Sequence, residues 1–147
     1  VHEVLERVRS LILAEYPSGI LIRRDYDTSA PLLKGDKEQM IQVVLNIARN
    51  AAQAMEGVGE IRLRTRIVRQ ATLAKRRYKL ALELQVIDDG PGIPQEIVGR
   101  LFQPFTSGRP EGTGLGLSIV RRIIDAHGGS VTARNTPHAE FSIFLPR

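Results

Sequence analysis

The chain has 147 residues, 42% of them hydrophobic and 25% charged, with no cysteine and a formal net charge of +5 at pH 7. This length fits one domain with a full core, and the lack of cysteine excludes disulfides and cysteine-based zinc sites. The basic residues are not interleaved with aromatic residues, which argues against a nucleic-acid partner. The sequence has no apolar run of ~20 residues and no signal peptide, so we expect no membrane span and a cytoplasmic location.

The first part of the chain is predicted to form a covering helix and a strand. Apolar residues recur at helical spacing from residue 1 to about Tyr16, where a Pro-Ser-Gly turn ends the helix. A strand over 20–26 and a loop over 28–35 follow. Because the chain begins without Met and inside a helical pattern, we expect it to be part of a longer protein.

The next helix has a polar face made of carboxamides. An Asp at 36 followed by Gln39 is typical of a helix start, and glycines end the helix after Glu56. The carboxamides recur three or four residues apart: Gln39, Gln42, Asn46, Asn50 and Gln53. The expected apolar face holds Ile41, Val44, Leu45, Ala48, Ala52 and Met55. A solvent-facing stripe would normally be Lys, Glu and Arg, whereas carboxamides suit a site that meets phosphates and Mg²⁺. From the helix alone, a polar face packed on a loop is an equally good interpretation.

A basic hairpin is expected after this helix. A strand is expected from Glu60 to about Val68, with one solvent-exposed, basic face and one apolar face. The hairpin holds eight of the 21 basic residues: Arg62, Arg64, Arg66, Arg69, Lys75, Arg76, Arg77 and Lys79. Between Ile61 and Leu82 there is no acidic residue. We expect these charges chiefly to blunt an edge strand; a docking patch for an acidic partner protein is the alternative.

Two glycine-rich loops favour a nucleotide site, one directly after a predicted strand and one at the start of a predicted helix. The first, 88–92, comes after an alternating strand over 80–87, so Asp88 ends that strand and can accept a hydrogen bond from a flat donor such as an adenine amino group. Its glycines let the backbone approach a ligand closely. The second, 112–117, opens a helix over 116–127, where free N–H groups and the helix dipole favour a phosphate.

The remaining segments close the domain. Pro94 is expected to open a short helix, and the segment over 101–111 has the look of a mobile loop. A left-handed cap is predicted at 128–129, after which two closing strands cover 130–135 and 140–145. The spacing of the second glycine loop fits neither the dinucleotide fingerprint nor the Walker phosphate loop.

Together these residues resemble the catalytic ATP-binding domain of sensor histidine kinases, in a superfamily with gyrase, Hsp90-type chaperones and MutL. Residues 36–51 look like the N box of that family, 88–93 like its G1 box, 102–105 like its F box, and 112–117 like its G2 box. The segment Arg24–Asp27, the short lid with Ser107–Arg109 and the ending Glu140–Pro146 look most like the nitrogen-regulatory sensor kinases (NtrB type).

The resemblance implies a fold and a domain organisation. We expect an α+β two-layer sandwich, with a mixed, mostly antiparallel sheet and about three helices on one face. Residues 1–147 would form a single catalytic ATP-binding domain, with the sensor and phosphoacceptor (dimerisation) domains upstream and absent from this chain. Because dimerisation in the family comes from the absent domain, we expect a monomer.

The resemblance also implies a site for Mg-ATP. Asp88 would take the adenine amino group, Asn50 would hold Mg²⁺, and Asn46 would lie along the phosphates. The full ATP-binding set would be Asn46, Asn50, Asp88, Gly90, Gly92, Ile93, Arg109, Gly112, Thr113, Gly114, Leu115, Gly116 and Leu117. An exposed loop Arg that binds nothing is the commoner case for Arg109. The lid would cover 101–111, anchored by Phe102 and Phe105.

One position departs from the family. A small hydroxyl residue usually stands two positions before the Phe of the last strand and helps to hold adenine through water, whereas this chain has Ala139. Adenine recognition then depends more heavily on Asp88. Asn46 stands where the ATPase branch has a Glu that activates water, and because an amide is no general base at neutral pH, slow hydrolysis is expected.

The implied activity is transfer of the γ-phosphoryl group of ATP to a histidine on the separate phosphoacceptor domain of the same protein. His2 is expected to be a surface histidine and not the acceptor. A response regulator is the further implied partner, together with a PII-type signalling protein. An anti-sigma-factor type serine kinase, disfavoured by the F box, and a non-catalytic nucleotide-sensing module that binds a partner through the basic hairpin are the alternatives.

Overall fold

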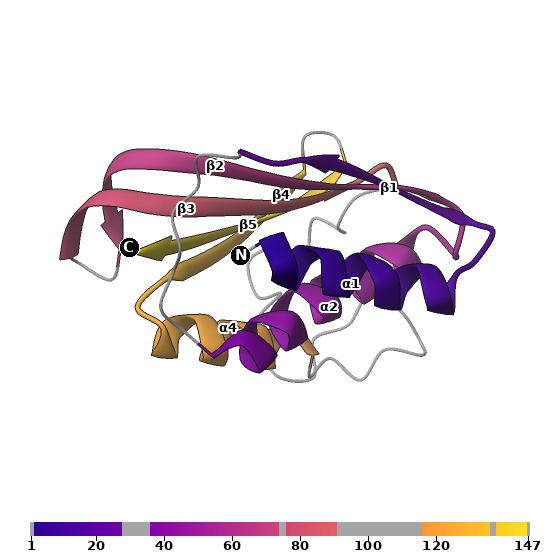
Figure 1. Cartoon of the computed structure of the whole chain (residues 1–147), viewed down its shortest axis with the longest axis horizontal. Helices are drawn as coiled ribbons and strands as arrows, with labels where there is room; N and C mark the ends of the chain where they lie inside the picture. The colour runs from indigo at the N-terminus through magenta and orange to yellow at the C-terminus, as the bar shows by residue number, and fades with distance from the viewer. Residues whose placement is uncertain (1, 28–35, 74–75, 91–115, 136–137, 147) are drawn as a thin grey trace.

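A five-stranded sheet carries the described helices on one of its faces (Figure 1). This computed structural model describes residues 2–27, 36–73, 76–90, 116–135 and 138–146. Its elements are α1 (His2–Glu15), β1 (Ile20–Asp25), α2 (Lys37–Ala54), β2 (Gly59–Leu73), β3 (Arg76–Asp88), α4 (Gly116–Ala126), β4 (Ser130–Asn135) and β5 (Ala139–Pro146). The predicted α+β two-layer sandwich is confirmed.

The strands lie in the order β1-β2-β3-β5-β4. Only β1 and β2 run parallel; the other neighbours are antiparallel. The sheet is therefore mixed and mostly antiparallel, as predicted. Among the described helices, none has the length and apolar character needed to span a bilayer.

The β2–β3 pair is longer than the rest of the sheet. Pairing with β1 ends at Arg64 and pairing with β5 ends at Ala81, whereas β2 and β3 stay paired as far as Leu73 and Arg76. The outer part, residues 69–73 and 76–80, is a two-stranded ribbon, at the left of Figure 1. The predicted end of β2 at Val68 is therefore wrong by five residues. Cross-strand hydrogen bonds extend a hairpin even where no apolar face is buried.

The core lies between the helices and the sheet. On β3 the inward residues Leu82, Leu84 and Val86 are buried, in the alternation that the sequence predicts. Helix α2 contacts α1 on one side, α4 on the other and the sheet beneath. A larger part of the α2 surface is therefore buried than the sequence predicted. The added buried residues are Val43, Ile47 and Ala51, while Leu45 is only half-buried.

The ends of the helices follow local chemistry. Asp36 caps α2 as predicted, because its Oδ1 accepts a hydrogen bond from the Gln39 N–H at 3.1 Å. Gly128 ends α4 with φ +74°, which is the predicted left-handed cap. Beside it, His127 donates from Nδ1 to the Ile123 carbonyl (2.8 Å) and accepts at Nε2 from the Asp36 N–H (3.3 Å). The end of α4 is thereby joined to the start of α2.

His2 is not the surface histidine that we predicted. It is half-buried, its ring stacks on Tyr26 with centroids 4.7 Å apart, and its Nε2 lies 3.0 Å from the Thr65 hydroxyl. That hydroxyl accepts the Asp27 N–H at 2.8 Å, which leaves its own hydrogen for His2. Burial lowers the pKa of His2. The histidine therefore helps to fasten α1 to the sheet.

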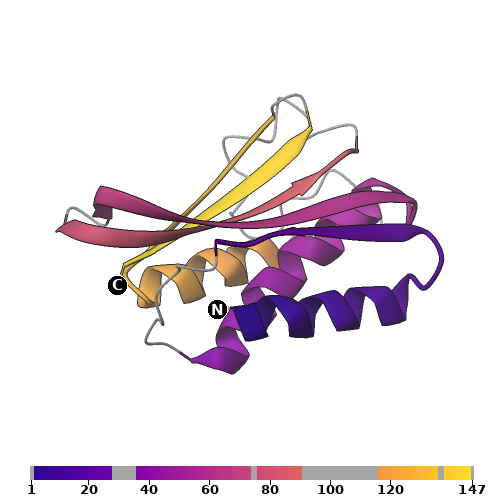
Figure 2. The ribbon, with the colours of Figure 1, turned by 45° about the horizontal axis from the view of Figure 1, so that its top comes forward.

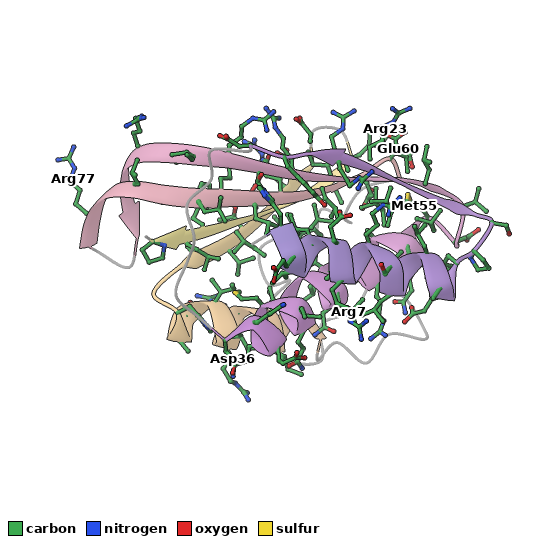
Figure 3. All side chains as sticks on the ribbon, in the orientation of Figure 1. Arg7, Arg23, Asp36, Met55, Glu60 and Arg77 are labelled. Carbon is green, nitrogen blue, oxygen red and sulfur yellow. The ribbon has the colours of Figure 1, made fainter. Side chains whose placement is uncertain are left out.

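The basic face of β2 is partly neutralised. Arg62 is exposed, but Arg64 and Arg66 are half-buried and pair with Asp25 at 3.6 and 2.8 Å. In the same way Arg23 of β1 pairs with Glu60 at 2.8 Å, and Figure 3 shows the two side chains together. The inner half of β2 is covered by β1, so the edge-strand interpretation is wrong there. It holds only beyond Arg64, where no described strand pairs with the outer side of β2.

Candidate functional site

Three parts of the fold carry the predicted site residues that the structure describes. They are the end of β3 with Asp88 and Gly90, the polar face of α2, and the start of α4 with Gly116 and Leu117. The other predicted ligands lie outside the described residues: Gly92, Ile93, Arg109, Gly112, Thr113, Gly114 and Leu115. The short helix expected at Pro94, the F box and the lid also lie outside them.

Asp88 is a buried carboxylate held by backbone groups. It is the last residue of β3, only 4% exposed, and its Oδ1 accepts the Gly90 N–H at 2.9 Å. The Ala139 N–H also donates to this carboxyl group, and burial raises its pKa. A carboxylate offers about four acceptor positions, so capacity for a ligand donor remains beyond these two backbone bonds. A buried acid with a shifted pKa is typical of a functional site.

The loop after Asp88 passes close to the end of α2. A Cβ added to Gly90 would lie 3.0 Å from Cγ of Met55 and 3.3 Å from Oδ1 of Asp88. A side chain at position 90 would therefore be tightly packed against protein atoms, whereas the predicted close approach of this glycine to a ligand stays a prediction. Next to it, Oδ1 of Asp89 accepts the Glu60 N–H at 3.1 Å, which ties the loop to the start of β2.

The carboxamide face of α2 is on its more accessible side. Asn46 and Asn50 are half-buried, and the other carboxamides are exposed: Gln39, Gln42 and Gln53. This exposure agrees with a face that meets a ligand, and the alternative, a loop packed on the same face, concerns residues outside the described part of the chain. Half-buried carboxamide oxygens are suitable ligands for a hard cation.

The start of α4 lies beside the middle of α2. The two helices are in contact, and the bond from Asp36 to His127 brings the start of α2 to the end of α4. They therefore run in opposite senses. With 11 residues, α4 is about 16 Å long, close to the ~15 Å that separate Asp36 from Asn46 along α2. In Figure 2, α4 passes behind the middle of α2.

The described site residues thus follow one line along α2. Gly90 and Asp88 lie at the end of α2, next to Met55, and Asn50 and Asn46 come before it. By the rise of the two helices, the start of α4 is about level with Asn46. One end can accept a hydrogen bond from a base, and the other offers a helix N-terminus to phosphates. Within the described part of the chain no group of three His, Cys, Asp or Glu could hold a metal ion.

Sequence reasoning missed one contact at this site. His138, between the last two strands, donates from Nδ1 to the Gly90 carbonyl at 2.5 Å. A histidine directly before the last strand was the visible signal, but its partner lies 48 residues away.

A second contact was missed on the opposite face of the sheet. There the buried Glu140 accepts from Gln85 Nε2 at 2.5 Å and from Arg134 Nε at 3.1 Å. The strand register pairs Glu140 with Ile87, directly before Asp88, so this pair closes the end of the β3–β5 ladder.

Comparisons with known proteins agree with this geometry. Residues 35–147 match the family model of the histidine kinase-, DNA gyrase B- and HSP90-like ATPases. A curated relative, the sensory histidine kinase/phosphatase NtrB of Salmonella typhimurium, is 52% identical over 149 residues, which cover 99% of this chain and 42% of the relative. The chain therefore spans less than half the length of that protein.

Solved structures of histidine kinases have the same fold. Full-length ShkA in complex with AMPPNP superposes with a TM-score of 0.80 at 27% identity, over 98% of this chain and 29% of that one. The histidine kinase ThkA in complex with the response regulator protein TrrA gives a TM-score of 0.76 at 25% identity, over 99% of this chain and 40% of that one.

Proposed function

We propose that this chain, which belongs to the histidine kinase-, DNA gyrase B- and HSP90-like ATPase family, is the catalytic domain of a sensor histidine kinase. We further propose that this kinase is cytoplasmic and of the nitrogen-regulatory (NtrB) type. It binds Mg-ATP and transfers the γ-phosphoryl group to a histidine on a separate phosphoacceptor domain. The observation that carries this proposal is the line of groups from the buried Asp88, past Asn50 and Asn46, to the start of α4.

Each group on that line has a proposed role. The Asp88 carboxylate accepts a hydrogen bond from the adenine amino group, and Asn46 lies along the phosphates. The amides of Gly112 to Gly116 and the N-terminus of α4 hold the phosphate oxygens through N–H groups and the helix dipole. Arg109 adds a cation. Asn50 supplies one oxygen to Mg²⁺, which when bound neutralises negative charge on the phosphates.

The rest of the proposed ATP-binding set follows the family motifs: Gly90, Gly92, Ile93, Thr113, Gly114, Leu115 and Leu117. Phosphoryl transfer depends mainly on positioning and charge neutralisation, and these residues provide both. The acceptor histidine is not part of this machinery. Instead, the half-buried His2 contacts Thr65 and Tyr26, which supports a structural role for it.

A response regulator and the phosphoacceptor domain of the parent chain are the proposed partners. ThkA, which shares this fold, was solved with a response regulator, and the 52% identity with an NtrB supports nitrogen regulation as the pathway. A PII-type signalling protein is a further proposed partner.

The decisive experiment is incubation of this domain with γ-labelled ATP, Mg²⁺ and the separately produced phosphoacceptor domain. Acid-labile, alkali-stable label on the acceptor domain is the expected result. Release of free phosphate would instead indicate an ATPase. Intact ATP without transfer, in this mixture and in the intact parent protein, would indicate a non-catalytic nucleotide-sensing module.

The carboxamide at Asn46 makes a separate prediction. Because an amide is no general base at neutral pH, Asn46 cannot activate water as a carboxylate would, and the isolated domain should hydrolyse ATP slowly. Phosphate release measured over hours tests this. A clearly measurable turnover that Asn46→Ala abolishes would contradict it.

A further inference from the structure

We infer that His138 is a positioning residue of the adenine site, which acts through Gly90 and Asp88 to hold the carboxylate in place for the amino group of the base. The inference rests on the proposed function and deepens it, because it adds to the site a residue from the turn between β4 and β5. It depends on three contacts that meet at the end of β3.

The first contact is between the strand ends. The ladder between β3 and β5 finishes with the pair Ile87 and Glu140, so Asp88 and Ala139 are the next residues on each strand. There the Asp88 carboxylate accepts the Ala139 N–H in place of a backbone acceptor. The position of the carboxylate is therefore tied to the position of the chain at Ala139, directly after His138.

The second and third contacts hold the Gly90 residue from both sides. Its N–H donates to Oδ1 of Asp88 at 2.9 Å, and its carbonyl accepts from Nδ1 of His138 at 2.5 Å. Because a carbonyl can only accept, the hydrogen is on Nδ1. The imidazole, the Gly90 residue and the carboxylate thus form a closed chain of contacts that returns to His138 through Ala139.

This closed chain opposes the cost of burying Asp88. Burial raises the pKa of Asp88, while the Gly90 N–H and the charge of His138 lower it. His138 itself is exposed, so it can support the carboxylate without adding to its burial. Loss of the imidazole removes one of the two hydrogen bonds that hold Gly90. The Asp88 carboxylate, which accepts from the amino group of adenine, is then held less accurately in position.

The loss of nucleotide affinity on removal of His138 should therefore depend on the base and not on the phosphates. Helix α4 and the carboxamides of α2 belong to elements other than the β4–β5 turn that carries His138. A nucleotide that lacks the amino group does not use the Asp88 acceptor. Removal of His138 should weaken ATP and leave such an analogue unaffected.

The test is calorimetric binding of Mg-ATP and of the Mg complex of purine riboside triphosphate, which has no 6-amino group. His138→Ala should weaken ATP about three- to tenfold, the range expected for one hydrogen bond, and change the analogue by less than about twofold. His138→Asn, whose side-chain N–H can take the place of Nδ1–H, should restore ATP affinity. Thr132→Ala, an exposed change on β4, is the matched control.

Three results would overturn the inference: unchanged ATP affinity in His138→Ala, equal weakening of both nucleotides, or no recovery in His138→Asn. Asp88→Asn separates this failure from failure of the proposed function. If Asp88→Asn weakens ATP while His138→Ala has no effect, only the role of His138 is wrong. If Asp88→Asn has no effect on ATP, the proposed adenine site itself is wrong.

Discussion

The two ends of β3 belong to the same strand but have very different surroundings. At the Asp88 end the strand lies between β2 and β5, under the helices, and its last carboxylate is buried and held by backbone N–H groups. At the Arg76 end it pairs only with β2, in the ribbon made of 69–73 and 76–80. Figure 3 shows Arg77 at this far end, well away from Met55, which lies beside the Asp88 loop.

This difference indicates where the fold can hold a ligand with accuracy. A two-stranded ribbon is only marginally stable by itself, and its described cations, Arg69 and Arg77, are exposed. The buried Asp88 carboxylate, in contrast, cannot move without breaking its hydrogen bonds to backbone N–H groups. The site end therefore supports specific recognition, whereas the ribbon end can contribute charge. Four predictions test this contrast.

The largest effect is expected on stability. Leu84→Ala, in the buried middle of β3, should lower the free energy of unfolding by about 2–5 kcal/mol, because it leaves a cavity between sheet and helices. Arg77→Ala, in the exposed part of the same strand, should change it by less than about 0.5 kcal/mol. Urea denaturation of both variants measures the difference. Similar losses would mean that the ribbon is part of the cooperative core.

The second prediction concerns the two adjacent acids at the site end. Asp88→Asn should weaken Mg-ATP about tenfold or more, since a hydrogen bond to a charged group contributes roughly 1.5–3 kcal/mol. Asp89→Asn should have a much smaller effect, because Asp89 bonds the Glu60 N–H at the start of β2. Calorimetry at one salt concentration compares them. Equal losses would remove the distinction between the two acids.

The third prediction is a pH dependence. Because burial raises the pKa of Asp88, its carboxyl group takes up a proton at a higher pH than an ordinary Asp, whose pKa is about 3.9. The protonated group is a poorer acceptor, so ATP affinity should fall as the pH is lowered through the raised pKa. The ratio of affinities between wild type and Asp88→Asn should shrink over the same range. A ratio that stays constant with pH would contradict this.

The smallest effect is expected at the ribbon. Reversing two exposed charges there, Arg69→Glu with Arg77→Glu, should change Mg-ATP affinity by less than about twofold at physiological salt, because charges beyond a Debye length of ~8 Å are screened. The same variant can be tested for binding to a PII-type protein. A large change in ATP affinity would show that the two ends are not independent.

Features that depend on neighbours in the chain could be predicted from the sequence. The cap at Asp36, the left-handed Gly128 and the alternation along β3 each follow from residues at most four positions apart. The same holds for the placement of Asp88 at a strand end and of the carboxamides on one side of α2. The order of the family motifs, which are also local patterns, then implied the fold class through the resemblance.

What the tertiary structure decided are the contacts between distant residues. Val43, Ile47 and Ala51 are buried because α2 lies between two helices, and a periodicity within one helix cannot show how many neighbours it has. His2 meets Thr65 across 63 residues, and the ribbon extends because β2 and β3 pair beyond the sheet.

The sequence by itself thus determined most of the elements, the family motifs and the placement of Asp88, Asn46 and Asn50 on those elements, since these depend on residue type and short spacing. Only the tertiary structure decided that Arg64 and Arg66 are balanced by Asp25, and that His138 reaches Gly90. Such pairs form where the strand register and the turns bring side chains together, and neither is visible in a spacing along the chain.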